Sequence, residues 1–290
     1  MKEMIHLDGV PETMLWTLYN RATEALRPDA WIKDPEAVRI YQSIAYDYAR
    51  SFGVPDSSHA VRSLMFDEVV GAWMKSHPGG TVVELACGLE TQFHRCDDGR
   101  VRWLCVDVPE AIDVRERFLS PSERCRHLRG SAFDEHWMDE VDPSRGVFVT
   151  AQGLFMYFEE AQIKTLVTRI AERWSEVDLM FDMLPRWLSR KTLSGLWATP
   201  HYRVPPMPWG VNRDEIAPLL KSWSKRVVSV AEAPYRRYRG FPEAFVPLIA
   251  YVPLLWKYLP NIVHARFSSS EENLASRAGL GGVGVDVPAG

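Results

Sequence analysis

The residues best placed to do chemistry lie between Glu84 and Thr91, a segment that reads ELACGLET. It follows a short β-branched run that predicts a buried strand, so it forms the turn at the carboxyl end of that strand. A dinucleotide site needs G-x-G-x-x-G here, because a pyrophosphate must lie against bare backbone at a helix N-terminus. This turn has Ala86 and Thr91 at two of those glycine positions, keeps Gly88, and adds the negative charge of Glu90. A pyrophosphate is therefore disfavoured by both space and charge.

An adenosine-containing ligand without a phosphate fits the turn better. Asp107 ends the next predicted strand, at about the 20-residue spacing at which an acidic residue accepts hydrogen bonds from ribose hydroxyls. Glu84, beside the turn, suits a positively charged group. Strand, turn and acidic residue together predict a site for S-adenosylmethionine, which carries an adenine, a ribose, a cationic sulfonium and an amino-acid tail. The alternative is a Rossmann-like domain whose acidic residues only cap helices.

The elements that must position these residues alternate between strand and helix. Strands are predicted at 81–87, 101–107, 126–130, 146–151, 177–183, 225–231 and 262–267, with helices at 109–119 and 159–174. Such alternation predicts a parallel, doubly wound α/β sheet with helices on both faces. Ahead of the sheet, residues 10–78 predict helices at 11–25, after Asp34-Pro35, and at 62–74.

The chain therefore divides into three parts. Residues 1–80 are predicted to form a helical N-terminal cap and residues 81–267 one Rossmann-like domain, which is a reasonable size for a single domain. Residues 268–290 are rich in Gly, Ala and Ser and predict a flexible tail.

Composition excludes several classes of function. The formal net charge is −4 and the pI is about 6.1, which removes the electrostatic term behind general nucleic-acid binding. The four cysteines lack metal-ligand spacing and predict buried free thiols in a reducing compartment, the cytoplasm. The N-terminus lacks the apolar stretch of a secretory signal. The apolar segment at 245–256 is too short to span a membrane and contains two prolines, so it predicts core.

Three motifs resemble those of the leucine carboxyl methyltransferase and tetracenomycin-type polyketide O-methyltransferase superfamily. VVELACGLETQFHR at 82–95 resembles its VVNLGAGLDTRFYR signature, WLCVDVPEAI at 103–112 its W-x-E-V-D-L-P-E-V-I, and AQGLFMY at 151–157 its A-E-G-L-L-M-Y-L. Asn20 to Glu24, Asp34-Pro35, Arg62 and Asp67 agree as well. The resemblance runs from about residue 15 to 267.

The resemblance implies a class I methyltransferase fold, with seven mostly parallel strands of which the last is antiparallel, and S-adenosylmethionine as cofactor. Arg62 would pair with the carboxylate of the methionine tail, and Arg21 is a second candidate for that role. Asp107 would hold the ribose. The remaining residues expected at the cofactor are Glu84, Ala86, Gly88, Ser131, Ala132, Phe133 and Gln152. No metal is implied.

Four positions depart from the family pattern. Ala86 replaces a usual Gly and Glu90 replaces Asp. Ser131 replaces an Asp beside the adenine, and Gln152 replaces a Glu near the methionine amino group. The last two changes remove carboxylates from the cofactor site.

The substrate side is predicted from the segment at 185–210, which is too long for a bare connection and reads as a substrate lid. Trp187, Trp197 and Trp209 in this segment suit a flat polycyclic substrate, or alternatively pack the lid onto the core. Its other candidates are His201 as a base, Tyr202, and Arg203 as the partner of a substrate carboxylate. Tyr157 is a further candidate, as a pocket wall or a proton donor.

The leading hypothesis is a cytoplasmic enzyme of secondary metabolism that methylates an oxygen of a small aromatic or polyketide-type molecule. A carboxylate acceptor is already ionised at neutral pH and needs no base, whereas a phenol gains from one. The alternatives are a protein C-terminal carboxyl methyltransferase and a non-catalytic ligand-binding protein on the same scaffold. The sequence leaves the oligomeric state open.

Overall fold

The computed structural model describes residues 2–5, 7, 9–236, 239 and 258–269. The apolar segment at 245–256 and nearly all of the predicted tail lie outside these residues. Within the described part of the chain, no helix is both long enough and apolar enough to cross a membrane.

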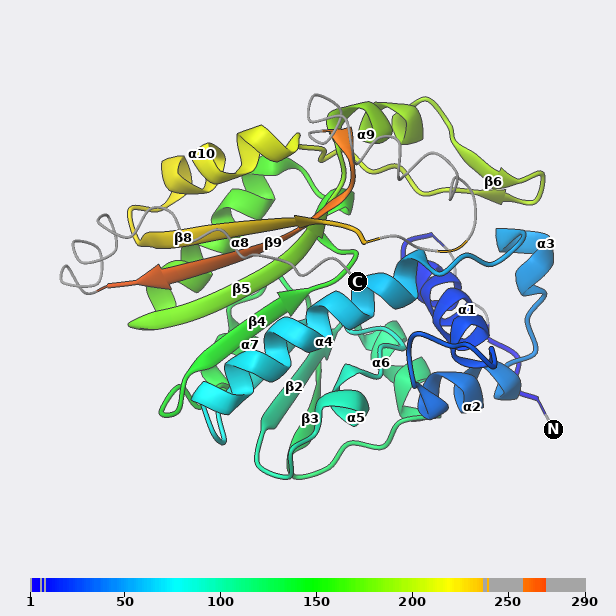
Figure 1. Cartoon of the computed structure of the whole chain (residues 1–290), viewed down its shortest axis with the longest axis horizontal. Coiled ribbons are helices and arrows are strands. Elements are labelled where there is room, and N and C mark those ends of the chain that lie inside the picture. Colours follow the sequence, from blue (N-terminus) through cyan, green and yellow to red (C-terminus); the bar gives the residue numbers. More distant parts are fainter. Residues whose placement is uncertain (1, 6, 8, 237–238, 240–257, 270–290) are drawn as a thin grey trace.

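A seven-stranded sheet forms the centre of the molecule, in the order β3-β2-β1-β4-β5-β9-β8 (Figure 1). The strands are β1 (Thr81–Leu85), β2 (Arg102–Asp107), β3 (Cys125–Arg129), β4 (Val147–Ala151), β5 (Glu176–Met183), β8 (Val227–Pro234) and β9 (Asn261–Ser268). The strands from β3 to β5 pair in parallel, whereas β9 is antiparallel to both of its neighbours. This confirms the predicted fold class, including the antiparallel last strand. The strand order changes direction between β1 and β4, which is where open α/β sheets bind ligands.

Helices cover both faces of the sheet because its strands are apolar on both sides. Along each strand, successive side chains point to opposite faces. Val82 and Phe148 pack on the face that α4 (Ser58–Ser76) crosses, and Val83 and Val149 pack on the other face. That second face is covered by α7 (His136–Asp139), α8 (Glu160–Arg173) and α10 (Arg213–Trp223) (Figure 1). The connections after β1 and β2 form α5 (Gln92–Cys96) and α6 (Pro109–Glu116).

The N-terminal helices gather near the carboxyl ends of the parallel strands (Figure 1). They are α1 (Thr13–Ala25), α2 (Pro35–Ser43) and α3 (Tyr48–Phe52). Asp34 caps α2 as predicted, because its Oδ1 accepts a hydrogen bond from the N–H of Ala37 at 3.0 Å. The apolar face of α1 packs in one cluster with Leu89, which follows β1, and with Ala111 of α6. These helices are therefore joined to the sheet by a shared core.

The segment predicted as a lid forms α9 (Arg186–Leu193) and a small hairpin of β6 (Trp197–Thr199) and β7 (Tyr202–Arg203). The hairpin reaches the N-terminal helices, where the hydroxyl of Thr199 donates to the carbonyls of Arg50 and Ser51. A 3₁₀ turn, η1 (Phe155–Tyr157), follows β4. The segment after β5 and the N-terminal helices thus approach each other across the same edge of the sheet (Figure 1).

A buried group of charges joins the N-terminal helices to the loop after β1. Arg21 of α1 contacts Glu90 of that loop at 3.0 Å and Asp34 at 3.6 Å. Arg95 of α5 contacts Glu90 at 2.8 Å, Asp34 at 2.7 Å and Asp67 of α4 at 2.7 Å. Burial by itself would raise the pKa of Glu90, but the Arg21 and Arg95 guanidinium groups hold that pKa below its usual value. This charge network fixes the loop relative to three helices.

We expect Glu90→Gln to lower the free energy of unfolding at pH 7 by about 3 kcal/mol, because it leaves two buried guanidinium groups undercompensated. Since Glu90 has a lowered pKa in the folded protein, its stabilisation is complete above the ordinary Glu pKa of about 4.3 and is lost as the pH falls below it. Urea unfolding at pH 7 and at pH 3 measures both effects.

The matched control is Glu68→Gln, which removes an exposed ion pair with Arg236 and should cost less than about 1 kcal/mol. A Glu90→Gln protein as stable as the control at pH 7 would contradict a structural role for the charge network.

Candidate active site

A cavity of about 590 Å³ lies at the carboxyl ends of β1, β2, β4 and β5. Its walls come from the loops after these strands, from α1 and α4, and from the segment after β5. Every residue predicted at the cofactor lines this cavity: Arg62, Glu84, Ala86, Gly88, Asp107, Ser131, Ala132, Phe133 and Gln152. Tyr157 lines it as well. The topology therefore brings together residues that are up to 95 positions apart in the sequence, because the carboxyl ends of parallel strands meet at one edge of the sheet.

The loop after β1 follows a tight path beside the cavity. Ala86 has a φ of 54° and is the sole non-glycine residue with positive φ in the described part of the chain. Gly88 has a φ of 44°, and a Cβ there would lie 3.0 Å from Cβ of Met14. The backbone N–H groups of Cys87, Gly88 and Glu90 are already hydrogen-bonded within the protein. The loop thus offers few donors to a phosphate, which agrees with the exclusion of a pyrophosphate.

Asp107 holds this loop and also faces the cavity. Its Oδ2 accepts from the N–H of Gly88 at 2.8 Å, and its Oδ1 accepts from the N–H of Val108 at 2.8 Å. A carboxylate has about four acceptor positions, so both oxygens can still accept from hydroxyl groups of a ligand. Burial raises the pKa of Asp107, while the two backbone hydrogen bonds act in the opposite direction.

Two buried arginines hold the carbonyl groups of the same loop from the side away from the cavity. Arg115 of α6 donates to the carbonyl oxygens of Gly88 at 3.0 Å and Glu90 at 2.7 Å. Arg21 donates to the carbonyl of Leu89 at 2.8 Å. Charge-assisted hydrogen bonds of this kind are stronger than neutral ones. The loop is therefore shaped by side chains from outside, although it has few glycines.

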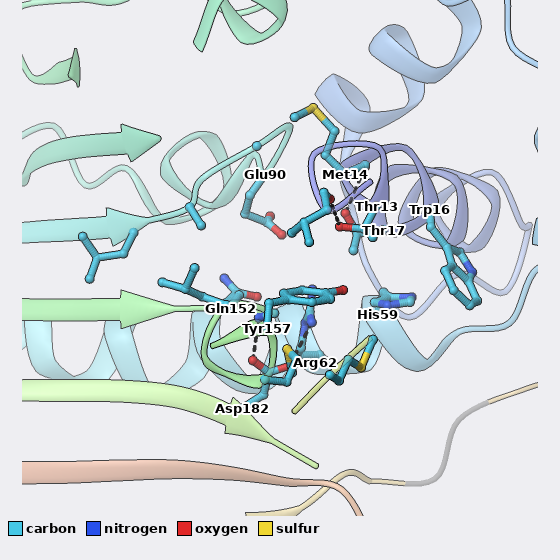
Figure 2. Close-up of a pocket in the computed structure, with 18 of the residues that line it drawn as sticks. Thr13, Met14, Trp16, Thr17, His59, Arg62, Glu90, Gln152, Tyr157 and Asp182 are labelled. Carbon is cyan, nitrogen blue, oxygen red and sulfur yellow. Dashed lines mark hydrogen bonds and ion pairs between the residues drawn. The ribbon is translucent and has the colours of Figure 1, made fainter. Parts of the chain in front are cut away.

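Arg62 is the cation of the cavity wall. Its Nη1 contacts Asp182 at the end of β5 at 2.9 Å, and Asp182 also accepts from the N–H of Gly153 and the hydroxyl of Tyr235 (Figure 2). Burial would lower the pKa of Arg62, but Asp182 keeps that pKa above its usual value. The arginine therefore stays charged beside the loop after β4.

Three buried polar atoms at the cavity have no hydrogen-bond partner among the described residues. They are Nε of Arg62, Oε1 of Glu84 and Oε1 of Gln152. An unpaired buried donor or acceptor costs free energy, so such atoms mark places where a ligand supplies the partner. A free donor on a cation matches a carboxylate of a ligand, and the free oxygens of Glu84 and Gln152 match its positively charged end. Burial raises the pKa of Glu84 well above its usual value, so a cation beside it would favour the ionised carboxylate. The site therefore fits the amino-acid end of S-adenosylmethionine.

Ser131, Ala132 and Phe133 line the cavity after β3, which is separated from β5 and Asp182 by three strands of the sheet. The ring of Phe133 packs against that of Phe158, with a centroid separation of 4.3 Å. An apolar ring pair beside a serine suits a flat heteroaromatic group such as an adenine.

Tyr157 lies in the middle of the cavity, between Gln152 on one side and His59 on the other (Figure 2). Burial raises the pKa of Tyr157 to about 12, with Arg62 acting in the opposite direction. Its hydroxyl is therefore protonated at neutral pH and can donate a hydrogen bond.

Comparison with known proteins agrees with this arrangement. The family model described as "Leucine carboxyl methyltransferase" matches residues 15–171. The chain belongs to this family. It is 33% identical over 193 residues to the tetracenomycin polyketide synthesis O-methyltransferase TcmP of Streptomyces glaucescens, covering 66% of this chain and 72% of that protein. It is 26% identical over 194 residues to the S-adenosyl-L-methionine-dependent methyltransferase dpfgK of Gibberella zeae, covering 60% of this chain and 65% of that protein.

Among solved structures, the magnesium protoporphyrin IX methyltransferase from Synechocystis matches with a TM-score of 0.47 at 12% identity, over 89% of this chain and 100% of that one. By its family, the chain is a methyltransferase that uses S-adenosylmethionine as its cofactor.

The residues predicted on the substrate side of the methyltransferase lie elsewhere. None of Arg21, Trp187, Trp197, His201, Tyr202, Arg203 and Trp209 is among the described residues that line the cavity. Arg21 belongs to the charge network. His201 and Arg203 are exposed on the hairpin, while Tyr202 is buried against the rings of Trp16 and Phe52.

None of the three predicted tryptophans lines the cavity, and for Trp187 the reason is helix geometry. On α9, Leu188 and Thr192 face the cavity. Trp187 is one residue earlier, which is about 100° around the helix axis, and it is 49% exposed. Trp197 is 56% exposed, and Trp209 is buried against Phe155 and Phe181. The segment after β5 thus lines the cavity with aliphatic side chains. These are Leu188, Leu196, Val204 and Met207.

Sequence reasoning missed several residues of the methyltransferase cavity. Trp16, Thr13 and Thr17 come from α1, and His59 comes from α4 (Figure 2). His59 lies three residues before Arg62, so both side chains share one face of α4. That spacing was a usable signal for His59. The residues of α1 carried no comparable signal, because their role depends on how the helix docks.

We expect Ala86→Gly to raise the free energy of unfolding of the methyltransferase by up to about 1 kcal/mol. Left-handed backbone costs an L-residue roughly 1–2 kcal/mol, and the greater chain entropy of glycine offsets part of this gain. The control is Ala111→Gly, which also lines the cavity but lies in α6, and it should cost about 1 kcal/mol. Thermal unfolding that ranks the two variants in the reverse order would contradict the strain at Ala86.

Proposed function

We propose that this methyltransferase transfers the methyl group to an oxygen of a small aromatic or polyketide-type molecule. The observation that carries the proposal is that one continuous cavity extends from the candidate cofactor residues to an apolar wall made by α1 and the segment after β5. Trp16, Leu188 and Met207 of this wall suit a flat apolar molecule. The name of the Streptomyces relative, a polyketide synthesis O-methyltransferase, supports the same class of acceptor.

On this proposal, Arg62 pairs with the carboxylate of the cofactor and Asp107 accepts hydrogen bonds from its ribose. Glu84 and Gln152 face its cationic end, and Ser131 and Phe133 contact its adenine. When bound, the cofactor supplies an activated methyl group on a sulfonium. The protein aligns the acceptor oxygen and excludes water from the site.

The charge states of the cavity favour an acceptor that is already ionised. Glu90 and Asp182 are engaged in ion pairs with arginines, and Tyr157 is protonated at neutral pH. Glu84 and Asp107 are assigned to the cofactor, and Nδ1 of His59 is engaged by Asn20. A carboxylate acceptor needs no base, whereas a phenol needs one. His201 is exposed on the hairpin, so a role as base would require that hairpin to move. We therefore rank a carboxylate above a phenolic hydroxyl.

The apolar wall with Trp16, Leu188 and Met207 suits an aromatic small molecule better than the polar backbone of a protein C-terminus. We propose that the segment at 185–210 acts as a substrate lid through its aliphatic face.

Free cysteines at positions 87, 96, 105 and 125 support a reducing compartment such as the cytoplasm.

We expect Asp107→Asn to weaken binding of S-adenosylmethionine at least tenfold, because an amide cannot accept both backbone hydrogen bonds and also hold a ribose. Isothermal titration calorimetry measures this change. The control is Asp113→Asn on α6, which alters an exposed ion pair with Arg129 of β3 and should leave the affinity unchanged. Absence of heat with either S-adenosylmethionine or its demethylated product, at millimolar ligand and with the unaltered protein, would refute the cofactor assignment.

The proposed reaction is tested by incubation with methyl-labelled cofactor and a panel of aromatic acids and phenols. We expect label in the organic product, released by mild base if the product is an ester and retained if it is an ether. Label that appears only in added peptides with a free C-terminus would instead support the protein-modifying alternative.

A further inference from the structure

His59 lies at the acceptor side of the cavity, where it neighbours Trp16 and Arg62 (Figure 2). The charge network and the cofactor loop make no use of it. An imidazole in this place can either take a proton from an acceptor or donate a hydrogen bond to it, and the two roles require different tautomers. The surrounding hydrogen bonds decide between them.

Asp56, Asn20 and His59 form a chain of hydrogen bonds. Nδ2 of Asn20 donates to Oδ1 of Asp56 at 3.1 Å, which fixes the orientation of the amide. The same nitrogen lies 2.9 Å from Nδ1 of His59. Because an amide nitrogen only donates, Nδ1 of the imidazole must accept. In a neutral imidazole the proton is then on Nε2.

The charge of the ring is set by its neighbours. Burial and the positive charges of Arg62 and Arg21 lower the pKa of His59 well below its usual value, with Glu90 acting in the opposite direction. Asp56 is the other titratable group of the chain of hydrogen bonds. Burial raises the pKa of Asp56, with its hydrogen bonds to Ser58 acting in the opposite direction. The imidazole is therefore neutral at pH 7. With Nδ1 engaged by Asn20, its Nε2–H is the ring group left to bind a ligand in the cavity.

We propose that His59 binds the methyl acceptor by donating a hydrogen bond from Nε2–H to one of its oxygens, and that Asn20 and Asp56 are positioning residues that fix this tautomer. The proposal rests on the proposed function and assigns the part of the acceptor that the protein recognises. A fixed Nε2–H cannot take a proton from a phenol. It fits an aromatic molecule that presents a carboxylate or carbonyl oxygen.

The tautomer is measured directly by nitrogen-15 NMR of the histidine side chains in the full chain. The sequence has eight histidines, and His59→Gln identifies the signals of His59. We expect the two-bond correlation pattern of the Nε2–H tautomer between pH 6 and pH 8. A pattern of the Nδ1–H tautomer, or an imidazolium at pH 7, would overturn the proposal.

The role of Asn20 is tested by Asn20→Leu, which removes the donor to Nδ1 without adding a titratable group. The Nε2–H tautomer then loses its selective stabilisation, and we expect signals of the Nδ1–H tautomer to appear. Asn212→Leu, at the N-terminus of α10, is the matched control and should leave the His59 signals unchanged. Unchanged signals in Asn20→Leu would refute the positioning role.

Acceptor recognition is tested with 2-naphthoate and 2-naphthol in the presence of the demethylated cofactor. We expect His59→Leu to weaken 2-naphthoate binding roughly tenfold to hundredfold and to raise its KM, since a hydrogen bond to a charged group is lost. His59→Gln keeps an N–H donor and should recover part of the affinity. His136→Leu, an exposed position on α7, should have no effect.

Two outcomes would contradict donation by His59. Unchanged binding of 2-naphthoate in His59→Leu is one. An equal loss of kcat in both His59 variants, together with loss of one limb of the pH profile, is the other and would indicate a general base. Failure of the unaltered protein to bind S-adenosylmethionine would count against the proposed function alone, because the NMR result does not depend on the cofactor.

Discussion

The structure depends on one constraint: charges buried away from water must be neutralised by partners. Glu90 lies in the loop that shapes the cofactor site, and it is compensated by Arg21 from α1 and Arg95 from α5. Asp34, at the start of α2, shares both arginines. Removing any member leaves an uncompensated buried charge, which is far more costly than losing an exposed ion pair. The N-terminal helices and the sheet are therefore coupled through the loop itself, so the position of α1 and the shape of the cofactor site are not independent.

This coupling explains how a loop with few glycines can take the path that a glycine-rich loop takes in other nucleotide sites. Its carbonyl groups are held by Arg115 and Arg21 from behind, and its N–H of Gly88 is held by Asp107. Side-chain hydrogen bonds thus supply what backbone freedom supplies elsewhere. The cost is visible at Ala86, whose positive φ is retained because the surroundings over-determine it.

The cavity wall made by the segment after β5 follows a different physical rule. Which residues of the segment after β5 face the cavity depends on the phase of α9, since adjacent residues of a helix differ by about 100°. Leu188 and Thr192 share the inward face, and Trp187 falls outside it. Large aromatic residues in a segment near the strand ends are therefore a weak guide to the wall of a pocket. On the other wall, α1 contributes Trp16 and α4 contributes His59, whose hydrogen bond with Asn20 adds a directional group to an otherwise apolar surface.

The sequence by itself determined the strands, the parallel sheet and which residues at the strand ends line the cavity. These follow from local signals, because residues at the ends of parallel strands must meet at one edge, as Gly88 and Asp107 do. The antiparallel last strand and the places of Ser131 and Gln152 came instead from motifs that resemble those of a known family. The tertiary structure alone decided the partner of Arg21, the orientation of the tryptophans and the hydrogen bond between His59 and Asn20. Each of these depends on how separate helices dock and on which buried groups they bring within hydrogen-bond distance. No local pattern encodes such contacts between segments distant in the chain.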